Sequence, residues 1–536
     1  MSHNSTKMID LQAFPKDIFT LIIEQLVIGV GIHTAVRLRT VNKSFDTAII
    51  EAICVSQVVD IYDPATPDLV YFIGSTLRGK IFLTKLLSAK ATSKPHFSVI
   101  AQVCQTLDDL IGETDEVLVK CRHNNISEAV GSLYSVYSRD KPVDAELEVQ
   151  NLLSGAILCQ SLPLVKLFVE SFADVNGATP YFGRPLNLAA STGNLEIFLY
   201  LLDCGASTVS FSSTNQYEDI HGEESDWKSP DEAALWHIAS TYRDPPASTL
   251  RAAVLGGHEK IIDLLLLPQH LVCASRFEYF RAILVAVRSG RLDLIKKLFH
   301  ITGKELSEFP GFGKEMIWEA VRCDRKDVVQ FLLDNGVDIN VFPDPDIRTY
   351  RGTLQIAASR GNISMVSFLI ERGADINFNG PNKAGGLPIE VAAQYGQEEV
   401  VGLLLEHGAD PSKALRSAAK GSQQRVVKLL LEKFTDLPFQ EDGDVGREAL
   451  WNAIAARNLT AIALLVDAGI SLNDGYEYST LLPINIAKQG PGPWVVNYLI
   501  SLGAQETDAV AYTDECPVNI RGILVSERTW EWVSKY

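Results

Sequence analysis

The side chains with the greatest capacity for chemistry are the ten histidines and eight cysteines, and they are dispersed along the chain. Histidines that share a zinc ion on a helix stand four residues apart, and zinc-binding or redox-active cysteines stand in Cys-x-x-Cys pairs. Neither spacing occurs, and the complete Gly-x-x-x-x-Gly-Lys-Ser/Thr and Gly-x-Ser-x-Gly motifs are also absent. We therefore expect no enzyme activity, no metal site and no cofactor.

Two adjacent segments repeat one pattern of apolar residues and glycines. In "GLPIEVAAQYGQEEVVGLLLEHGADPS", residues 386–412, a short alanine-rich run ends at Gly396, and an apolar stripe then runs to Gly408. Glycine fits both places because it adopts positive φ without steric cost. Nearly the same text stands at 351–377. The pattern predicts two short helices joined by a turn, followed by an extended loop that Pro411 favours.

The turn between the two helices recurs along the chain with a spacing of about 33–35 residues, a period of helical repeat proteins. Its positions are Gln160, Gly193, Gly257, Gly290, Asp324, Gly361, Gly396, Ser422, Arg457 and Pro491. Two helices this short cannot bury their apolar faces alone, so stacked units must share one continuous core. The step from Gly396 to Ser422 is shorter than the others, which predicts a trimmed loop between them.

This period, with its "AA..G" first helix and "V..LL..GAD.N" second helix, resembles the ankyrin repeat family. The resemblance covers roughly residues 150–506 and implies an all-α ankyrin-repeat solenoid of about ten helix-turn-helix-loop units. The family's Thr-Pro-Leu-His opening survives as "RPLN", "LPIE" and "LPIN". Asn187, Glu390 and Asn485 therefore replace the family's histidine, which predicts weaker hydrogen bonds between adjacent loops.

Composition restricts the partners and the compartment. The 536 residues are 46% hydrophobic, and a net charge of -18 disfavours nucleic acid and anionic membranes as partners. No uncharged apolar run is long enough to span a membrane, and the polar start "MSHNSTKMIDLQ" is unlike a signal peptide. The scattered cysteines fit small, reduced core residues. We therefore expect a cytoplasmic or nuclear protein.

The N-terminal residues 11–53 stand outside the repeat pattern. "FPKD" favours a helix start, an apolar face follows, and after a glycine-containing loop around "VIGVGIHT" a second helix carries "VNKSF". The "FPKD" and "VNKSF" motifs resemble the two ends of an F-box. An F-box followed by ankyrin repeats is similar to F-box/ankyrin proteins of filamentous fungi. The resemblance implies docking on the Skp-type adaptor of a cullin–RING ubiquitin ligase. The implied adaptor-binding residues are Pro15, Ile18, Ile22, Leu26, Leu38, Val41 and Phe45.

The same apolar residues would also serve a helical cap on the solenoid, because the terminal units of a repeat stack need covering. Apolar content alone does not separate a cap from an adaptor-binding face. Exposure of the first helix does separate them, because a cap buries that helix.

Three further segments have less distinct patterns. Residues 54–150 contain "DLVYFIGSTLRGKIFLTKLL" and "VIAQVCQTLDDLI", which predict helices of a connector or of degenerate repeats. The insertion at 208–249 is polar and acidic, which predicts an exposed loop, and we expect His237 in it to form structural hydrogen bonds. Residues 507–536 are expected to form a C-terminal cap or tail.

A solenoid presents its loops and first helices to a partner. Side chains that differ between units in these loops are candidates, because aromatic residues and arginine are favoured interface anchors. The candidates are Tyr181, Phe182, Arg184, Tyr350, Arg351, Asn382, Lys383, Tyr476 and Tyr478. We expect an adaptor whose ankyrin groove holds a protein target for a ubiquitin ligase. The alternatives are a ligase-independent scaffold or regulator, including an accessory factor of a fungal metabolic pathway, and an enzyme with a site in 54–150 or in the insertion.

Overall fold

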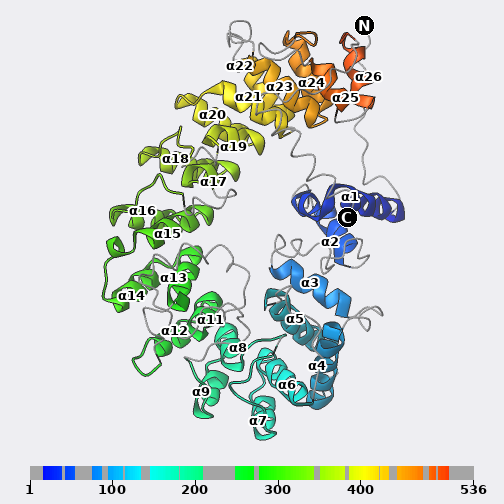
Figure 1. The fold of residues 1–536 in the computed structure, drawn as a ribbon. Coiled ribbons are helices and arrows are strands. Elements are labelled where there is room, and N and C mark those ends of the chain that lie inside the picture. The colour runs from blue at the N-terminus through cyan, green and yellow to red at the C-terminus, as the bar shows by residue number, and fades with distance from the viewer. Residues whose placement is uncertain are drawn as a thin grey trace. The chain divides into compact units, whose positions relative to one another are not determined.

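The computed structural model is a chain of short helices that follow one another in sequence order (Figure 1). The residues that it describes are 16–38, 43–54, 75–86, 95–112, 115–133, 145–179, 181–208, 248–270, 277–342, 351–380, 386–421, 423–433, 444–474, 482–489 and 493–505. Within these ranges every regular element is a helix, and one isolated β-bridge joins Thr179 and Gly183. No helix in the described residues is both long enough and apolar enough to cross a membrane.

The chain divides into two compact parts. The N-terminal part comprises residues 1–228 and 236–285, and the C-terminal part comprises residues 229–235 and 286–536. The helices of the N-terminal part are α1 (Lys16–Leu38), α2 (Lys43–Cys54), α3 (Ser75–Leu86), α4 (Pro95–Ile111), α5 (Glu116–Leu133), α6 (Ala145–Leu158), α7 (Leu162–Glu170), α8 (Pro185–Thr192), α9 (Leu195–Asp203), α11 (Thr249–Gly256) and α12 (Glu259–Leu265). The division falls inside α13 (Phe277–Ser289). The helices of the C-terminal part are α14 (Leu292–Thr302), the 3₁₀ helix η5 (Leu306–Glu308), α15 (Pro310–Arg322), α16 (Lys326–Asp334), α17 (Thr353–Ser359), α18 (Ile363–Glu371), α19 (Pro388–Gln394), α20 (Glu398–Glu406), α21 (Pro411–Lys420), α22 (Gln424–Lys433), α23 (Asp444–Ala455), α24 (Leu459–Asp467), α25 (Pro483–Gln489) and α26 (Pro493–Ser501).

The predicted turns fall between the first and second helix of each repeat, and their backbone conformation is the left-handed one that the glycines indicated. The observed φ angles are 56° at Gln160, 77° at Gly193, 77° at Gly257, 72° at Gly290, 58° at Asp324, 69° at Gly361, 74° at Gly396 and 57° at Arg457. The predictions at Ser422 and Pro491 lie outside the described residues. Gly193, Gly290, Gly361 and Gly396 therefore occupy equivalent places, as a repeat requires.

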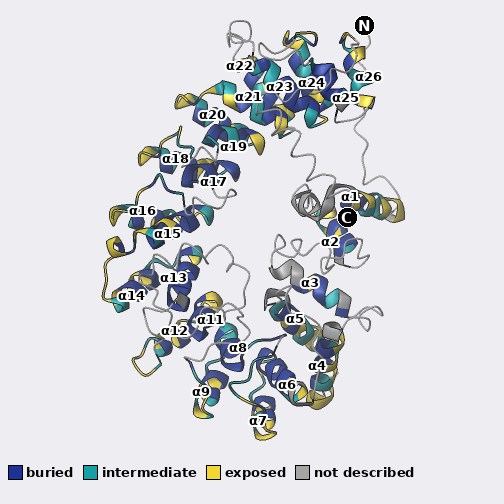
Figure 2. Ribbon diagram, viewed as in Figure 1, coloured by how far each residue is buried: buried dark blue, intermediate teal, exposed yellow. Residues whose placement is uncertain are grey.

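A column of alanines lets neighbouring first helices approach closely. Four residues before each turn position the residue is alanine, and each of these side chains is at most 1% exposed. The alanines are Ala156, Ala189, Ala253, Ala286, Ala320, Ala357, Ala392, Ala418, Ala453 and Ala487. Several pairs of successive first helices contact each other along this column, for example α19 with α21 and α21 with α23. The buried faces of these helices are visible as dark blue ribbon in Figure 2.

The residue after each turn, which we call the entry residue, is matched to the turn of the preceding repeat. His258 lies over Gly193, where an added Cβ would come within 2.2 Å of the imidazole, and Gln397 lies over Gly361 at the same separation. Both entry residues also bond the preceding repeat, because His258 Nε2 lies 2.9 Å from the Ser191 carbonyl oxygen and Gln397 Nε2 donates to the Ser359 carbonyl at 3.0 Å. Glycine at the turn therefore provides both positive φ and space for the next repeat.

Where the turn residue is not glycine, the next entry residue is short. Asn194 is the entry residue of the repeat that comes after the turn at Gln160. Asn362 is the entry residue of the repeat that comes after the turn at Asp324. Each asparagine accepts a hydrogen bond from a backbone N–H of its own second helix, at 3.0 Å from Ile197 N and 3.0 Å from Met365 N. These side chains cap their own helices instead of reaching back to the preceding turn.

The side chains that stand at the place of the family's histidine form hydrogen bonds to the next repeat. Gln355 stands at that place in its repeat and donates to the carbonyl oxygens of Phe378 and Gly386, both at 2.8 Å. Glu390 instead accepts from Arg416 at 2.7 Å. Asn187 accepts from the Thr249 hydroxyl at 2.8 Å. The oxygen atoms of Asn187 and Glu390 thus find donors on helices of the next repeat, and weaker hydrogen bonds between adjacent loops stay a prediction for these positions.

The prediction of an extended loop at Pro411 is wrong, and the prediction of a trimmed loop there is confirmed. α21 begins at Pro411 itself, and the Asp410 carboxylate accepts a hydrogen bond from Ser412 N at 2.9 Å. Proline fits the first position of a helix because its missing N–H would have no partner there, and aspartate is a favoured N-cap. Only residues 407–410 therefore separate α20 from the first helix of the next repeat.

The second helix of most repeats ends at a glycine with φ between 81° and 102°, as at Gly336 and Gly503. In the first repeat this place is taken by Phe172, which keeps φ at 68° and is 98% exposed. A left-handed conformation is costly for a residue with a Cβ, and the exposed ring gains little from packing.

We predict that Phe172→Gly raises the free energy of unfolding by roughly 0.5–1 kcal/mol, because strain relief outweighs the greater freedom of glycine in the unfolded chain. Denaturant unfolding of the full chain measures the change. Phe172→Ala is the control, since it removes the ring but keeps the Cβ, and it should give no gain. A lower stability for Phe172→Gly would contradict the prediction.

The N-terminal helices differ from the predicted arrangement at one point. α1 continues from Lys16 to Leu38 through Gly29 and Gly31, so the predicted glycine-containing loop around residues 27–34 is helical. Each glycine inside a helix costs about 1 kcal/mol relative to alanine, which an otherwise apolar run of this length tolerates. α1 contacts α2, and Ile23 and Val27 are fully buried.

The described residues between 54 and 150 include the predicted helices. α3 lies within the first predicted segment, and α4 begins at Pro95, four residues before the second segment, and ends with it at Ile111. α5 follows, and α6 begins at Ala145. The text "GSTLRGK" at 74–80 has the glycine and lysine spacing of a phosphate-binding loop, but Ile81 replaces the required Ser or Thr. Gly79 lies inside α3 and packs on the Glu128 backbone, where an added Cβ would come within 2.7 Å of the Glu128 Cα. This glycine therefore serves the close packing of α3 on α5.

Candidate protein-binding face

In several repeats the residues one and two places before the turn, at the end of the first helix, are exposed, and we call these positions the exposed edge. Leu255 is 61% exposed and Tyr395 is 39% exposed, and Ser289, Arg360, Gln394 and Lys420 are also exposed. These places are two to three residues from the buried alanine column on the same helices, so a rigid core holds them in position. Because their residue types change from repeat to repeat, they can distinguish partners.

At this edge of the C-terminal part, a buried carboxylate holds two arginines. Glu319 on α15 is completely buried, and its Oε1 atom accepts from Arg288 Nε at 2.6 Å. Its Oε2 atom accepts from Arg322 Nε at 2.8 Å. Burial alone would raise the pKa of Glu319, but the hydrogen bonds and charges of Arg322 and Arg288 hold this pKa below its usual value. Glu319 therefore stays ionised and fixes both guanidinium groups.

A cysteine thiol lies beside this carboxylate. Cys323 Sγ lies 3.6 Å from Glu319 Oε1. Burial, followed by the negative charge of Glu319, raises the pKa of Cys323. A thiol needs a lowered pKa to react as a thiolate near neutral pH, so Cys323 stays protonated.

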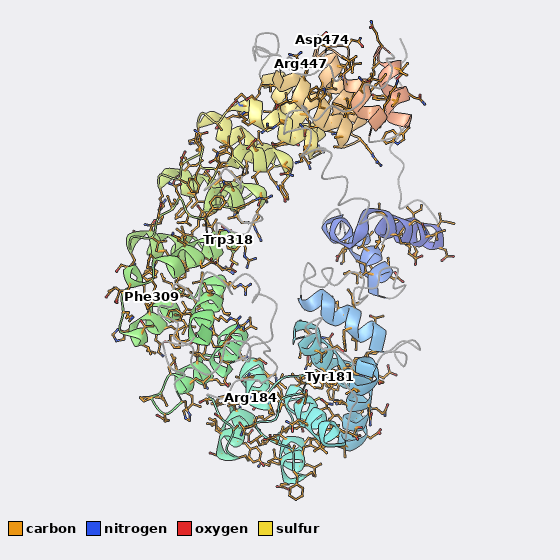
Figure 3. The ribbon with its side chains drawn as sticks, viewed as in Figure 1. Tyr181, Arg184, Phe309, Trp318, Arg447 and Asp474 are labelled. Atoms are coloured by element: carbon orange, nitrogen blue, oxygen red, sulfur yellow. The ribbon has the colours of Figure 1, made fainter. Side chains whose placement is uncertain are left out.

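Two aromatic side chains continue the edge toward α19. The Trp318 indole, labelled on α15 in Figure 3, donates to the Arg351 carbonyl oxygen at 2.6 Å. The Arg351 guanidinium lies over the Tyr395 ring, 4.6 Å from its centroid, and donates to the Tyr395 hydroxyl at 3.0 Å. Arg322 lies 6.0 Å from the Trp318 ring. We call Arg288, Arg322, Arg351 and Arg360, with Tyr395, the arginine cluster.

Three of the predicted partner-binding residues are buried, so they cannot contact a partner without rearrangement. Tyr181 is 5% exposed, Phe182 1% and Arg184 2%. The Arg184 guanidinium donates to Asn176 Oδ1 at 3.0 Å and to the Ser207 carbonyl at 3.1 Å, which ties its own loop to the next one (Figure 3). Burial lowers the pKa of Arg184. The prediction for these three residues is therefore corrected to a structural role.

Of the remaining predicted residues, Arg351 precedes α17 and is partly buried, and its guanidinium lies against Tyr395. Tyr350, Asn382, Lys383, Tyr476 and Tyr478 lie outside the described residues. Sequence reasoning missed Arg288, Arg322, Arg360 and Tyr395. Their common signal is their place one or two residues before an identified turn, where a short first helix must expose its end.

The predicted adaptor-binding residues lie on or beside α1 and α2. Ile18 is 45% exposed, whereas Ile22 and Leu26 are partly buried. Pro15 and Val41 lie outside the described residues, as do the side chains of Leu38 and Phe45. Leu21 and Ile28, which the sequence did not single out, are each 53% exposed. Ile18, Leu21 and Ile28 follow helical spacing on one face of α1 and form an exposed apolar stripe.

Other polar clusters in the N-terminal part have structural explanations. Asp108 on α4 binds Arg122 at 2.8 Å and His123 at 2.7 Å, which joins α4 to α5. Burial raises the pKa of the nearby Cys104 thiol to about 12. Among the residues that the structure describes, no three His, Cys, Asp or Glu side chains are grouped to hold a metal ion.

Comparison with known proteins places ankyrin repeats in this chain. Residues 317–414 match the family model described as ankyrin repeats (3 copies). The Ankyrin repeat and KH domain-containing protein mask-1 of Caenorhabditis elegans is 26% identical over 213 residues, which are 40% of this chain and 7% of that protein. The Ankyrin repeat domain-containing protein SAT10 of Stachybotrys chartarum is 23% identical over 313 residues, which are 57% of this chain and 12% of that protein. The chain thus matches only a small share of the length of these relatives.

Among solved structures, the human ASB11 ankyrin repeat domain is similar, with a TM-score of 0.29 and 22% sequence identity. The similarity covers 35% of this chain and 84% of that one. The segment matched by the family model includes Glu319, Arg322, Arg351, Arg360 and Tyr395. Residues 11–53 lie outside it, so the F-box-like interpretation stays a prediction.

Proposed function

Because the chain contains ankyrin repeats, which bind proteins, we propose that it is an adaptor with two binding faces. The exposed edge of the first helices holds a protein target. The apolar stripe of α1 docks on the Skp-type adaptor of a cullin–RING ubiquitin ligase. The chain would then be the substrate receptor of that ligase, and it would act by bringing two proteins together without performing chemistry itself.

The observation that carries the ligase part of the proposal is the exposure of Ile18, Leu21 and Ile28. A helix that caps the repeats would bury its large aliphatic residues, because each one gains roughly 1.5–3 kcal/mol on burial. α1 instead buries Ile23 and Val27 against its own domain and leaves a second apolar face exposed. Contiguous exposed apolar surface favours a protein interaction site.

We predict that Ile18→Asp with Leu21→Asp abolishes capture of a purified Skp-type adaptor by the full chain, because a charge in each contact would have to be desolvated. Surface plasmon resonance on the immobilised full chain measures the binding. Both residues are exposed, so the variant should keep the circular dichroism and thermal unfolding of the wild type.

The matched control is Val117→Asp with Leu118→Asp, which makes the same change at exposed residues of α5, where the side chains are 72% and 49% exposed. This control should bind the adaptor as the wild type does. If the wild-type chain does not bind the adaptor at all, the ligase role is excluded and the scaffold or regulator alternative is favoured.

A further inference from the structure

We propose that the arginine cluster binds an acidic segment of the target protein. This inference rests on the proposed function, because it assigns a chemical class to the protein that the repeats hold. It concerns the C-terminal part of the chain and does not depend on the N-terminal helices or on a ligase.

The cluster is continuous across four neighbouring first helices. Arg288 on α13 and Arg322 on α15 share Glu319, and Arg322 lies beside Trp318. Trp318 bonds the backbone of Arg351, and Arg351 reaches Tyr395 after α19. The cationic side chains are therefore arranged along the exposed edge, in the order of the repeats, where an extended peptide could contact several of them.

Several arginines of the cluster are partly exposed at its surface. The carboxylate of Glu319 is fully buried beneath the side chains of Arg288 and Arg322, which are 29% and 25% exposed. Arg360 is exposed, and within the described residues its guanidinium has no hydrogen bond and no ion pair. Burial lowers the pKa of Arg360 the most, and the positive charge of Arg322 lowers it further. The exposed acid nearest in sequence to Arg322 is Asp324, in the turn after α15.

The geometry of these groups fits carboxylates. A guanidinium presents a planar fork that matches a carboxylate with two parallel hydrogen bonds, and it is more weakly hydrated than a lysine ammonium. Arg351 is stacked on Tyr395, which fixes its position before a ligand arrives. Arginine and tyrosine are also the residue types that contribute most at protein interfaces. An acidic segment would thus bind donors that are already in position, so binding would cost little side-chain entropy in the cluster.

The charge of the whole chain favours a peptide over a nucleic acid as the occupant. The net charge of -18 repels a long polyanion, whose phosphates extend well beyond four arginines. A short acidic segment needs to approach only the cluster. At physiological salt the screening length is about 8 Å, so the attraction of the cluster acts locally while the repulsion from distant acids is damped.

The experiment is a selection from a display library of random 12-residue peptides on the immobilised full chain. We expect the enriched peptides to contain aspartate or glutamate at several times their frequency in the library. Fluorescence anisotropy then gives the Kd of the best labelled peptide. Arg360→Glu with Arg351→Gln should weaken that binding at least about tenfold, and raising salt from 50 to 300 mM should weaken binding to the wild type severalfold.

The matched control is Arg425→Glu on α22, where the side chain is 89% exposed and lies outside the cluster. It should change the Kd less than twofold. Enriched peptides without acidic residues, or acidic peptides whose binding ignores the double variant, would overturn the inference. If the enriched peptides lack acidic residues but lose binding to the Lys420→Glu variant, the proposed protein-binding edge of the C-terminal part stands without its acidic preference. Tighter binding of a labelled 12-nucleotide RNA than of any selected peptide, lost in the double variant, would also overturn it.

Discussion

Replacing Gly193 with alanine is expected to lower the free energy of unfolding by about 3 kcal/mol, the sum of a left-handed backbone penalty and a steric overlap. Gly193 has a φ of 77°, and a Cβ there would lie 2.2 Å from the His258 ring. The ring cannot simply turn away, because its Nε2 atom is bonded to the Ser191 carbonyl oxygen. Guanidinium chloride unfolding followed by circular dichroism measures the change.

Gly205 is the matched control for this substitution. It has a φ of 90°, but nothing lies within 4 Å of its added Cβ, so Gly205→Ala should cost only about 1 kcal/mol. Adding His258→Asn to Gly193→Ala should recover the steric part, as asparagine occupies the entry place after the turn at Gln160. Equal losses of unfolding free energy for Gly193→Ala and Gly205→Ala would show that the contact between repeats at the turn does not contribute to stability.

Glu319→Gln is expected to lower the free energy of unfolding by about 3 kcal/mol, because it leaves two partly buried arginines without their shared carboxylate. Arg288 and Arg322 both bond Glu319 directly. The control is Glu371→Gln, where the side chain is 72% exposed and pairs with Arg372 at 3.9 Å. That change should cost less than about 0.5 kcal/mol, because exposed ion pairs contribute little.

The pH dependence of this difference gives an independent test. The pKa of Glu319 is lower in the folded chain than in the unfolded chain. Its contribution is therefore fully present above the unfolded glutamate pKa of about 4.3 and is lost as the pH falls through the lower folded value. The stability difference between wild type and Glu319→Gln should accordingly be constant near neutral pH and shrink only in acid. A difference that grows in acid would contradict the assignment.

The repeat phase could be predicted because it depends on local backbone chemistry. Glycine after an alanine-rich run indicated the turn at Gly361 and Gly396, and the period then located turns at Gln160, Asp324 and Arg457, where no glycine signals them. The three non-glycine turns adopt the same left-handed conformation because the repeats on either side fix it. Periodicity thus carried information that the individual residue types did not.

Burial of loop residues could not be predicted in the same way. Tyr181, Phe182 and Arg184 were placed at the surface because aromatic and arginine residues in a loop suggest an interface. The loop instead folds inward through the bridge between Thr179 and Gly183, and Arg184 bonds the following loop. Such contacts depend on a neighbour more than 20 residues away, which the period alone does not position.

Part of the candidate binding face could be predicted from the sequence. Arg351 was identified, whereas Arg322, Arg360 and Tyr395 were not, although each stands one or two residues before an identified turn. The buried Glu319 could not be recognised, because a glutamate in a first helix ordinarily indicates a solvated surface. Its role depends on arginines in two repeats that point at one carboxylate.

The matching of entry residues to preceding turns means that the repeats are not interchangeable modules. Excising the repeat that contains Gly396 would place Gln423 against Gly361, and a long side chain would again meet a glycine. Excising the repeat that contains Gly361 would press Gln397 against Asp324, whose Cβ occupies the space that glutamine needs. Lineages that gain or lose whole units are therefore expected to break the array at some junctions and to leave others intact.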